Sequence, residues 1–404
     1  MLYSAGMGAG ILLRAVQEPV FMYQNPPLKT ASSAEKIALE FTFYQWGFTA
    51  WAFYALFALL IGYAVFKHKL PVSISSIFKS REEQKHTFFH KFIDVLTLLT
   101  TVFGLVAAVG LGAAQINGGL NHILETSLDY LTIILLVIGI GTLALISALS
   151  GVDKGIKRIS TLNIYLTLAL LVFVFVQSDM VNILIAFAEA TYQYIIDFVP
   201  MSLAVGAFDP GEKFLTDWTY YYWAFWLAWA PFTGIFIARI SQGRTLREII
   251  IGTLLIPSLG TFFWFSVFGD SAFTMIESWG EYNGEFGDVF SSIFVFLSGY
   301  PFASLINGIV ILLLVSFLVT SVDSAIYVMG MLSDRGNPHP SKRIRVLWGV
   351  LLTVFCVGIV LLGHARPESD ILTAVQKLLI VTSLPFAFLM IALVIAWLRK
   401  LKKP

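Results

Sequence analysis

Long apolar stretches alternate with short polar connections along the whole chain. A helix needs about 20 predominantly apolar residues to cross a hydrocarbon layer ~30 Å thick. This pattern predicts an all-α integral membrane protein with ten transmembrane helices. The predicted spans lie near residues 1–22, 42–66, 93–116, 129–149, 160–178, 217–239, 248–269, 302–331, 345–363 and 372–398.

Lysine and arginine collect in alternate connections between the predicted spans. The positive-inside rule assigns the side that carries them to the cytoplasm. We therefore expect a multi-pass protein of the cell (inner) membrane with both termini in the cytoplasm. The basic residues are Lys67, Lys69, Lys79, Arg81, Lys85, Lys91, Lys154, Lys157, Arg158, Arg239, Arg244, Arg247, Arg335, Lys342, Arg343, Arg345, Arg399, Lys400, Lys402 and Lys403.

Two connections on the opposite side are long and partly apolar. Residues 179–200 have the pattern of an amphipathic helix that lies along the outer membrane surface instead of crossing the membrane. Residues 270–288 carry Glu277, Glu281 and Glu285 and are predicted to form an acidic external cap. We expect both segments to act as lids or braces.

Ten spans divide into two sets of five with opposite orientation, which is the arrangement of inverted-repeat transporters. We therefore predict a single transmembrane transporter domain over residues 1–404. Within it, residues 1–178 form the first repeat and residues 217–398 form the second, with the external helix of residues 179–200 between them.

Glycine and proline fall at corresponding places in the first helix of each predicted repeat. The first span contains Gly6, Gly8 and Gly10, and the sixth contains Pro231 and Gly234. Inverted-repeat transporters bind their substrates between broken helices near mid-membrane, so these residues predict two helix breaks. The alternative is that the glycines only allow close packing between helices.

Composition narrows the classes of function. Hydrophobic residues make up 57% of the chain and charged residues 13%, and the mean hydropathy is +0.81, far more apolar than in a soluble domain. A net charge of +1 argues against a nucleic-acid partner. The chain has a single cysteine, Cys356, and lacks a nucleotide loop, a nucleophile motif and histidines at ligand spacing within a span. We expect no enzymatic activity and no organic cofactor, with the lipid bilayer as the main partner.

The stretch from residue 218 to residue 232 is the most aromatic in the chain. One interpretation is ordinary core packing or a membrane-interface belt. The other is a cage for a quaternary ammonium ion, because ring faces attract a cation that cannot donate hydrogen bonds. Trp46, Trp51 and Tyr54 of the second span could then supply the opposite walls. In a helix, spacings of three and four gather these rings on one side: Trp218, Tyr222, Phe225, Trp226 and Trp229.

A cluster of hydroxyl and carboxylate side chains lies in the eighth span. Thr320, Ser321, Asp323 and Ser324 occur within five consecutive residues. Sodium prefers oxygen ligands, which hydroxyls and carbonyls at an unwound helix can supply. Alternatively, the hydroxyls bond to carbonyls of their own helix. Asp323 is expected to have a partner, because a carboxylate within a membrane is costly.

These motifs together resemble the betaine/carnitine/choline transporter family. The strongest similarity covers residues 218–248, and the others occur in the family's order along nearly the whole chain. They are Gly6 to Gly10 followed by Glu18 and Pro19, Trp46 to Tyr54, Gly110 to Asn117, Ser150 to Lys157, and Val319 to Ser324.

The resemblance implies a LeuT-like core of two inverted five-helix repeats. It also implies sodium-coupled symport of a quaternary ammonium compatible solute, such as glycine betaine, by alternating access. The family normally has two helices before this core, and we expect both to be absent from this chain. Family members commonly form trimers, so a homotrimer is the expected assembly.

Site residues follow from the resemblance by motif. Trp46, Trp51, Tyr54 and Trp226 are similar to the family's aromatic box for the ammonium group. The resemblance assigns Tyr221, Phe225 and Trp229 to the path on either side, and it places the backbone of Ala5 and Met7 next to the substrate. The implied sodium ligands are the side chains of Thr320 and Ser321 and the carbonyls of Ser4, Met7 and Phe317.

Two residues depart from the family pattern. Arg14 replaces an apolar residue, and Phe225 stands where the family usually has tryptophan. Alternative hypotheses are transport of choline, carnitine, ectoine or a sulfonium solute with other coupling, and a truncated membrane protein without transport activity.

Overall fold

The computed structural model describes residues 8–29, 32–78, 88–150, 155–334, 336–365 and 371–401. These residues form helices and connections, and no strand occurs among them. Ten helical segments are long and apolar enough to cross a membrane, which confirms the predicted all-α membrane fold. The α-helices are α2 (Gly8–Arg14), α3 (Gln17–Gln24), α4 (Ala34–Trp46), α5 (Phe48–Gly62), α6 (Phe88–Leu124), α7 (Tyr130–Ser150), α8 (Gly155–Gln177), α9 (Met180–Leu203), α10 (Glu212–Phe214), α11 (Tyr221–Ile240), α12 (Leu246–Ile250), α13 (Ile256–Trp279), α14 (Ser292–Leu297), α15 (Ala303–Ser333), α16 (Lys342–Ala365) and α17 (Ile371–Leu401).

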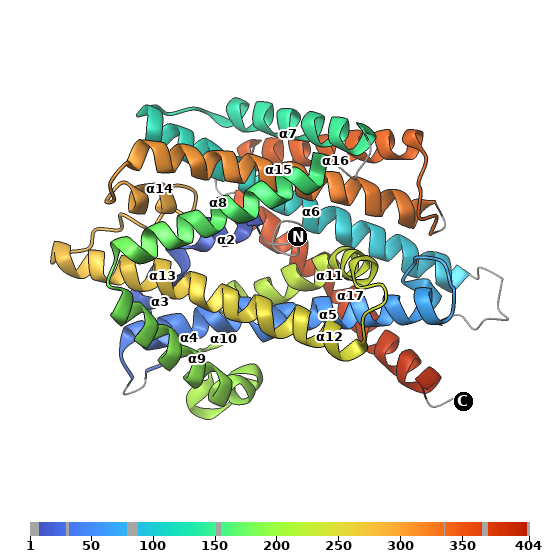
Figure 1. Cartoon of the computed structure of the whole chain (residues 1–404), viewed down its shortest axis with the longest axis horizontal. Coiled ribbons are helices and arrows are strands. Elements are labelled where there is room, and N and C mark those ends of the chain that lie inside the picture. The colour runs from blue at the N-terminus through green and yellow to red at the C-terminus, as the bar shows by residue number, and fades with distance from the viewer. Residues whose placement is uncertain are drawn as a thin grey trace.

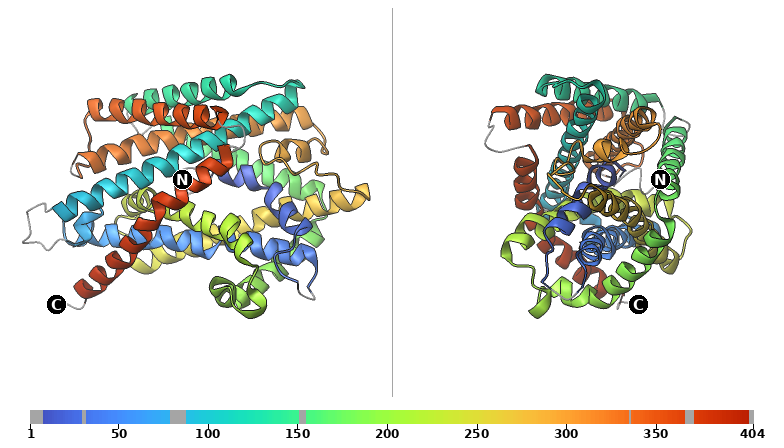
Figure 2. Two further views of the ribbon diagram at one scale, coloured as in Figure 1. Left: turned by 180° about the vertical axis from the view of Figure 1, so that it is seen from behind. Right: turned by 90° about the vertical axis from the view of Figure 1, so that its left-hand side faces the viewer.

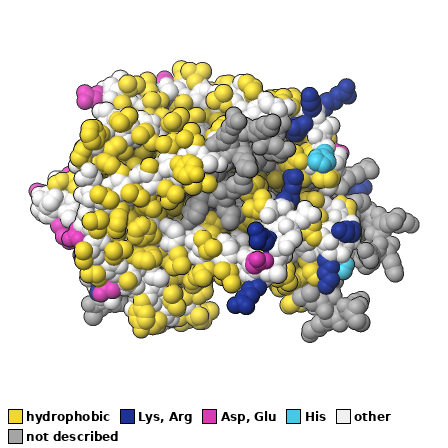
Figure 3. Space-filling model, viewed as in Figure 1, with side chains coloured by type: hydrophobic (Ala, Val, Ile, Leu, Met, Phe, Trp, Pro, Cys, Tyr) yellow, Lys and Arg dark blue, Asp and Glu magenta, His cyan; other side chains and the backbone are white. Residues whose placement is uncertain are grey.

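Most of the long helices run side by side along the longest axis of the molecule (Figure 1). Hydrophobic side chains cover the middle of the visible surface, while lysine and arginine gather at one end and most of the acidic residues lie near the other (Figure 3). This is the surface expected of a protein whose middle faces lipid. Seen nearly end-on, α4 and α5 lie inside a ring of other helices (Figure 2, right).

The described part of the first predicted span is divided into two helices and is not among the ten candidate spans. The helix α9 is among them instead. The described part of residues 1–22 consists of two short helices, α2 and α3, separated at Ala15 and Val16. The interruption therefore lies beyond the glycine-rich stretch, of which Gly6 falls outside the described residues. The helix α9 has 24 residues and is apolar enough to span. Its predicted position on the outer surface stays a prediction, as do the limits of the two repeats.

The second span has an interruption that the sequence pattern did not indicate. Gly47 separates α4 from α5 with backbone angles of φ −95° and ψ −131°. A Cβ atom there would lie 2.5 Å from the carbonyl oxygen of Phe43, so glycine is required. The backbone N–H of Phe48 loses its helical partner at this point and donates to the hydroxyl oxygen of Tyr194, 2.9 Å away on α9. Thus α9 braces the interruption directly after Trp46.

The predicted break in the sixth span is wrong. The helix α11 continues through Pro231 and Gly234 to Ile240. A Cβ atom on Gly234 would lie 2.5 Å from Cβ of Phe57, so this glycine lets α11 approach α5 closely. The irregular part of the segment comes earlier, as a π-helical turn over Leu215–Tyr220. Close packing, the alternative considered for these glycines, is what the structure shows.

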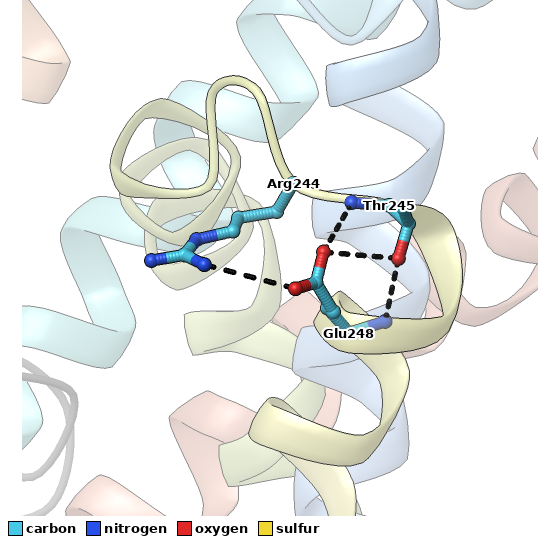
Figure 4. A network of polar contacts seen from close by, with 3 residues as sticks. All are labelled: Arg244, Thr245 and Glu248. Atoms are coloured by element: carbon cyan, nitrogen blue, oxygen red, sulfur yellow. Dashed lines mark hydrogen bonds and ion pairs between the residues drawn. The ribbon is translucent and has the colours of Figure 1, made fainter.

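The turn at the basic end of α11 is fixed by a capping box. The hydroxyl oxygen of Thr245 accepts a hydrogen bond from the backbone of Glu248 at 3.2 Å. The Glu248 carboxylate in turn accepts from the backbone N–H of Thr245 at 2.8 Å. Arg244 lies 3.7 Å from the other oxygen of this carboxylate (Figure 4). The network satisfies donors at the start of α12 and so sets where the seventh span begins.

Candidate substrate and ion site

A cavity of about 50 Å³ lies between α2, α4, α6, α11 and α15. By this measure of volume a water molecule needs ~10–15 Å³, so the cavity holds a few waters and a larger solute requires side chains to move. Its walls are mostly apolar and aromatic. Of the predicted substrate residues, those that line it are Trp46, Tyr221, Phe225, Trp226 and Trp229, together with Ser321 from the predicted ion site.

Trp46 is held in the cavity wall by contacts on three sides. As the last residue of α4, it lies where Gly47 redirects the chain. Gly10 of α2 comes so close that a Cβ atom there would be 3.3 Å from the Trp46 ring. The indole Nε1 donates to Glu18 at 3.0 Å, and the ring centroid lies 5.2 Å from that of Trp226. These contacts fix the direction of the ring face.

Trp226 is fully buried and joins α11 to the end of α4. Its Nε1 donates to the carbonyl oxygen of Gln45 at 2.8 Å. Its ring stacks on Tyr222 with centroids 5.9 Å apart and meets Phe225 edge-on at 5.1 Å. The indole nitrogen is therefore satisfied away from the cavity, which leaves π-surface toward it.

Three further aromatic residues of α11 extend the wall. Phe225 stacks on Trp229 with centroids 6.0 Å apart and lies 6.2 Å from Tyr221. The Trp229 Nε1 donates to the carbonyl oxygen of Gly104 on α6 at 3.1 Å. The helical spacing predicted that Phe225 and Trp229 share a side with Tyr222 and Trp226, and all four line the cavity. Trp218, also in the predicted stripe, does not line it.

Trp51 and Tyr54 lie behind this wall and do not line the cavity. Tyr54 meets Trp226 edge-on with centroids 6.2 Å apart, and Trp51 meets Tyr54 at 5.7 Å. Both side chains are fully buried on α5. The four predicted box residues therefore form one continuous chain of rings, of which only Trp46 and Trp226 face the cavity. Whether they bind substrate stays a prediction.

The predicted ion ligands on α15 lie next to the same cavity. Thr320 is buried, and its hydroxyl donates to the carbonyl oxygens of Ser316 and Phe317, each at 3.0 Å. A hydroxyl that donates in this way keeps oxygen lone pairs for a cation. Gly8 at the start of α2 is packed on the Phe317 ring. The other predicted contributors, Ser4, Ala5 and Met7, lie outside the described residues.

A buried carboxylate behind the aromatic wall was missed as a site residue. Glu18 accepts hydrogen bonds from Trp46 and from the hydroxyl of Tyr222, and its side chain is fully buried. An acidic residue within an apolar stretch was the available signal, because buried carboxylates in membranes usually have a partner or a function. By contrast Asp323, which drew attention in the sequence, is buried near Ser147 of α7 and the charge of Arg345 on α16, and it does not line the cavity.

Chemically, this arrangement is a place for a large cation that needs no hydrogen bonds. Rings along one side of the cavity attract a cation through their faces, and the carboxyl group of Glu18 accepts a hydrogen bond from the edge of the Trp46 ring, whereas Arg14 brings a positive charge to the same wall. Among the described residues, no cluster of three or more histidine, cysteine or acidic side chains could hold a metal ion. On α15, Ser321 lines this cavity and Thr320 directly precedes it.

The fold and the sequence have known counterparts. The crystal structure of a manganese transporter mutant from Eremococcus coleocola matches with a TM-score of 0.51 and 11% identity, over 98% of this chain and 78% of that one. This match defines the overall fold as one found in a membrane transporter. The model of the BCCT family, betaine/carnitine/choline family transporters, matches residues 1–404. The chain belongs to this family.

Individual relatives are similar along the whole chain. Glycine betaine transporter OpuD of Bacillus subtilis is 36% identical over 100% of this chain and 78% of its own length. Betaine/ectoine transporter LcoP of Corynebacterium glutamicum is 37% identical over 99% of this chain and 64% of its own length. A glycine betaine transporter of Acinetobacter baylyi is 34% identical over 98% of this chain, which spans 59% of that protein.

Proposed function

We propose that this protein is a sodium-coupled symporter of glycine betaine or a closely related quaternary ammonium solute. The observation that carries the proposal is the aromatic cavity between α2, α4 and α11, whose wall includes the rings of Trp46 and Trp226. Such rings stabilise a desolvated trimethylammonium group by about 2 kcal/mol or more. The relatives named as betaine transporters support the same substrate.

Sodium coupling is supported by oxygen ligands beside the cavity. Ser321 lines the cavity itself, and Thr320 precedes it on α15. A sodium ion bound by these hydroxyls and by nearby carbonyls would stabilise the helix contacts around the bound solute, so the two ligands would bind cooperatively. Alternating access then requires the cavity to open to each side in turn.

The proposed orientation places the basic end of the molecule in the cytoplasm. Lysine and arginine gather at the end of the visible surface where α17 terminates (Figures 1 and 3). By the positive-inside rule this end faces inward in the cell (inner) membrane, and both termini are cytoplasmic. A homotrimer remains the expected assembly from the family resemblance.

Competition binding separates glycine betaine from the alternative solutes. Purified protein in detergent should bind labelled glycine betaine in the presence of sodium, and choline, carnitine, ectoine and a sulfonium analogue are then added as competitors. We expect glycine betaine to compete best. Stronger competition by ectoine would identify the alternative substrate instead, and absence of binding to every one of these solutes would contradict the proposal.

A further inference from the structure

A permanently charged side chain lies in the wall of the aromatic cavity. Arg14 is the last residue of α2, is only 6% exposed and lines the cavity together with Trp46 and Tyr221. Its Nη1 donates to the amide oxygen of Gln17 at 2.5 Å, and its Cζ lies 5.3 Å from the centre of the Trp218 ring. These two partners are neutral, and the hydroxyl of Tyr221 also interacts with the guanidinium.

Arg14 forms no ion pair with a carboxylate in the described part of the chain. The three pairs found there within 4.0 Å are Lys36–Glu189, Lys213–Asp217 and Arg244–Glu248. Glu18 interacts electrostatically with Arg14, but its hydrogen bonds come from Trp46 and Tyr222. An arginine within a membrane is costly and usually faces a partner or a cavity. Arg14 lines the cavity.

The charges around the cavity have a fixed order. Gly10 and Arg14 are four residues apart on α2, so they lie on the same side of the helix about 6 Å apart along its axis. Gly10 contacts the Trp46 ring, and the carboxyl group of Glu18 accepts a hydrogen bond from the edge of that ring. One part of the wall therefore presents the ring of Trp46, whose edge is bonded to an acidic side chain. The neighbouring part presents a positive charge.

From this order we infer that Arg14 binds the carboxylate of a zwitterionic ammonium solute and makes the cavity selective for such solutes over ammonium compounds that carry only positive charge. The ammonium group of the solute faces Trp46 and Trp226, while its carboxylate accepts hydrogen bonds from the guanidinium. Guanidinium groups match carboxylates in geometry as well as charge. In glycine betaine a single methylene separates the two charged groups, so one cavity can contact both.

Choline is expected to bind less well to the same arrangement. It carries the same trimethylammonium group but ends in a hydroxyl, so it gains no charged hydrogen bond from Arg14 and is repelled by the guanidinium. Selectivity for the zwitterion thus comes from attraction and repulsion acting together. This inference rests on the proposed function, because it assumes that the ammonium group enters the aromatic cavity.

The first experiment needs no variant. Calorimetry on the purified wild-type protein with sodium compares glycine betaine, its methyl ester, choline and tetramethylammonium. The methyl ester keeps the ammonium group but has no carboxylate to form a charged hydrogen bond. We therefore expect the affinity for glycine betaine to be at least about tenfold higher than the affinity for the ester or for choline. Equal affinities for glycine betaine and its ester would overturn the inference while leaving the proposed function standing. If none of the four ligands binds, the proposed function itself is contradicted.

The second experiment assigns the selectivity to Arg14. In Arg14→Met, an unbranched apolar side chain replaces the guanidinium, and we expect glycine betaine to lose about tenfold or more in affinity while choline binds as well as before or better. Arg14→Lys should retain part of the preference, because it keeps the charge without the planar donors. The exposed Arg244→Met variant is the matched control and should leave all affinities unchanged. If Arg14→Met prefers glycine betaine over choline by the same factor as the wild-type protein, the inference is overturned.

Discussion

Two regions border the same cavity: the aromatic wall, which includes Trp46 and Trp226, and the hydroxyl cluster, which consists of Thr320 and Ser321. The polar atoms of these two regions have different kinds of hydrogen-bond partner. In the aromatic wall, Trp46 and Trp226 each donate their indole N–H to another segment, one to Glu18 and the other to the backbone of Gln45. In the hydroxyl cluster, Thr320 donates to carbonyls of its own helix α15. The rings are therefore positioned by tertiary contacts, whereas the hydroxyl is positioned by its helix.

This difference separates two kinds of site. Rings that are fixed by neighbouring elements keep their orientation when other side chains move to admit the solute, so less ordering entropy opposes binding. A single hydroxyl on a continuous helix supplies one oxygen, and a sodium site needs several more. We therefore expect the ammonium region to act as a preorganised site. The ion region is expected to be completed by other segments.

Removing the central ring should have the largest effect. Trp226→Ala deletes the indole face that lines the cavity, and we expect glycine betaine affinity to fall about 10- to 30-fold, in line with a desolvated cation–π contact. Trp223→Ala is the matched control on the same helix, because Trp223 does not line the cavity. Calorimetric titration measures both. A Trp226→Ala protein that keeps wild-type affinity would exclude this ring from the site.

Mutation of the hydroxyl cluster should lower the affinity for sodium. Thr320→Ala removes one oxygen ligand, and we expect the sodium concentration for half-maximal betaine uptake to rise about tenfold, comparable to loss of one charged hydrogen bond. Thr320→Ser keeps the hydroxyl and should behave nearly as wild type. Thr142→Ala is the control, since Thr142 bonds to its own helix in the same way on the exposed face of α7. An unchanged sodium dependence in Thr320→Ala would move the ion site elsewhere.

The hydrogen bond between Tyr194 of α9 and the backbone of Phe48 should contribute to the stability of the folded protein. Tyr194→Phe keeps the ring but leaves the Phe48 N–H without its hydroxyl partner, so we expect the free energy of unfolding to drop by about 1 kcal/mol. Tyr192→Phe, on the exposed side of the same helix, is the control. Chemical denaturation in detergent compares the variants. Equal stability of the two would show that the hydroxyl does not support the interruption.

The smallest effect is expected from a predicted box residue that does not line the cavity. Trp51 meets Tyr54, which in turn meets Trp226, so Trp51→Ala should weaken glycine betaine binding by about threefold or less. A protein in which Trp51→Ala matches Trp226→Ala would place the ammonium group among all four rings of the box that the family resemblance implies. The ratio of the two effects therefore locates the cation.

Much of the helical architecture could be predicted from the sequence, since long apolar stretches encode length and composition directly. The stripe of rings on α11 was also predictable, because helical spacing fixes which side chains share a face. Gly47 was not recognised as an interruption, because its necessity comes partly from the ring of Phe262 on α13, which a local pattern does not contain. Conversely, Pro231 and Gly234 suggested a break that close packing on Phe57 explains instead.

The site was predictable in its residue types but not in its geometry. Spacing could not reveal that Trp51 and Tyr54 lie behind Trp226, because that depends on how α5 is turned after Gly47. Glu18 was visible only as part of a motif, and its role behind the aromatic wall depends on the positions of Trp46 and Tyr222 in space. Long-range contacts of this kind leave no periodic trace in the sequence.

Uptake of labelled glycine betaine into proteoliposomes that contain the purified protein tests the central claim most directly. Sodium-coupled symport predicts accumulation above the external concentration when sodium is high outside and low inside, with collapse of the accumulation when the sodium gradient is dissipated. A potassium gradient of equal size is the control and should drive none. Equal uptake with and without the sodium gradient would contradict sodium coupling, and no protein-dependent uptake under either condition would contradict transport of this solute.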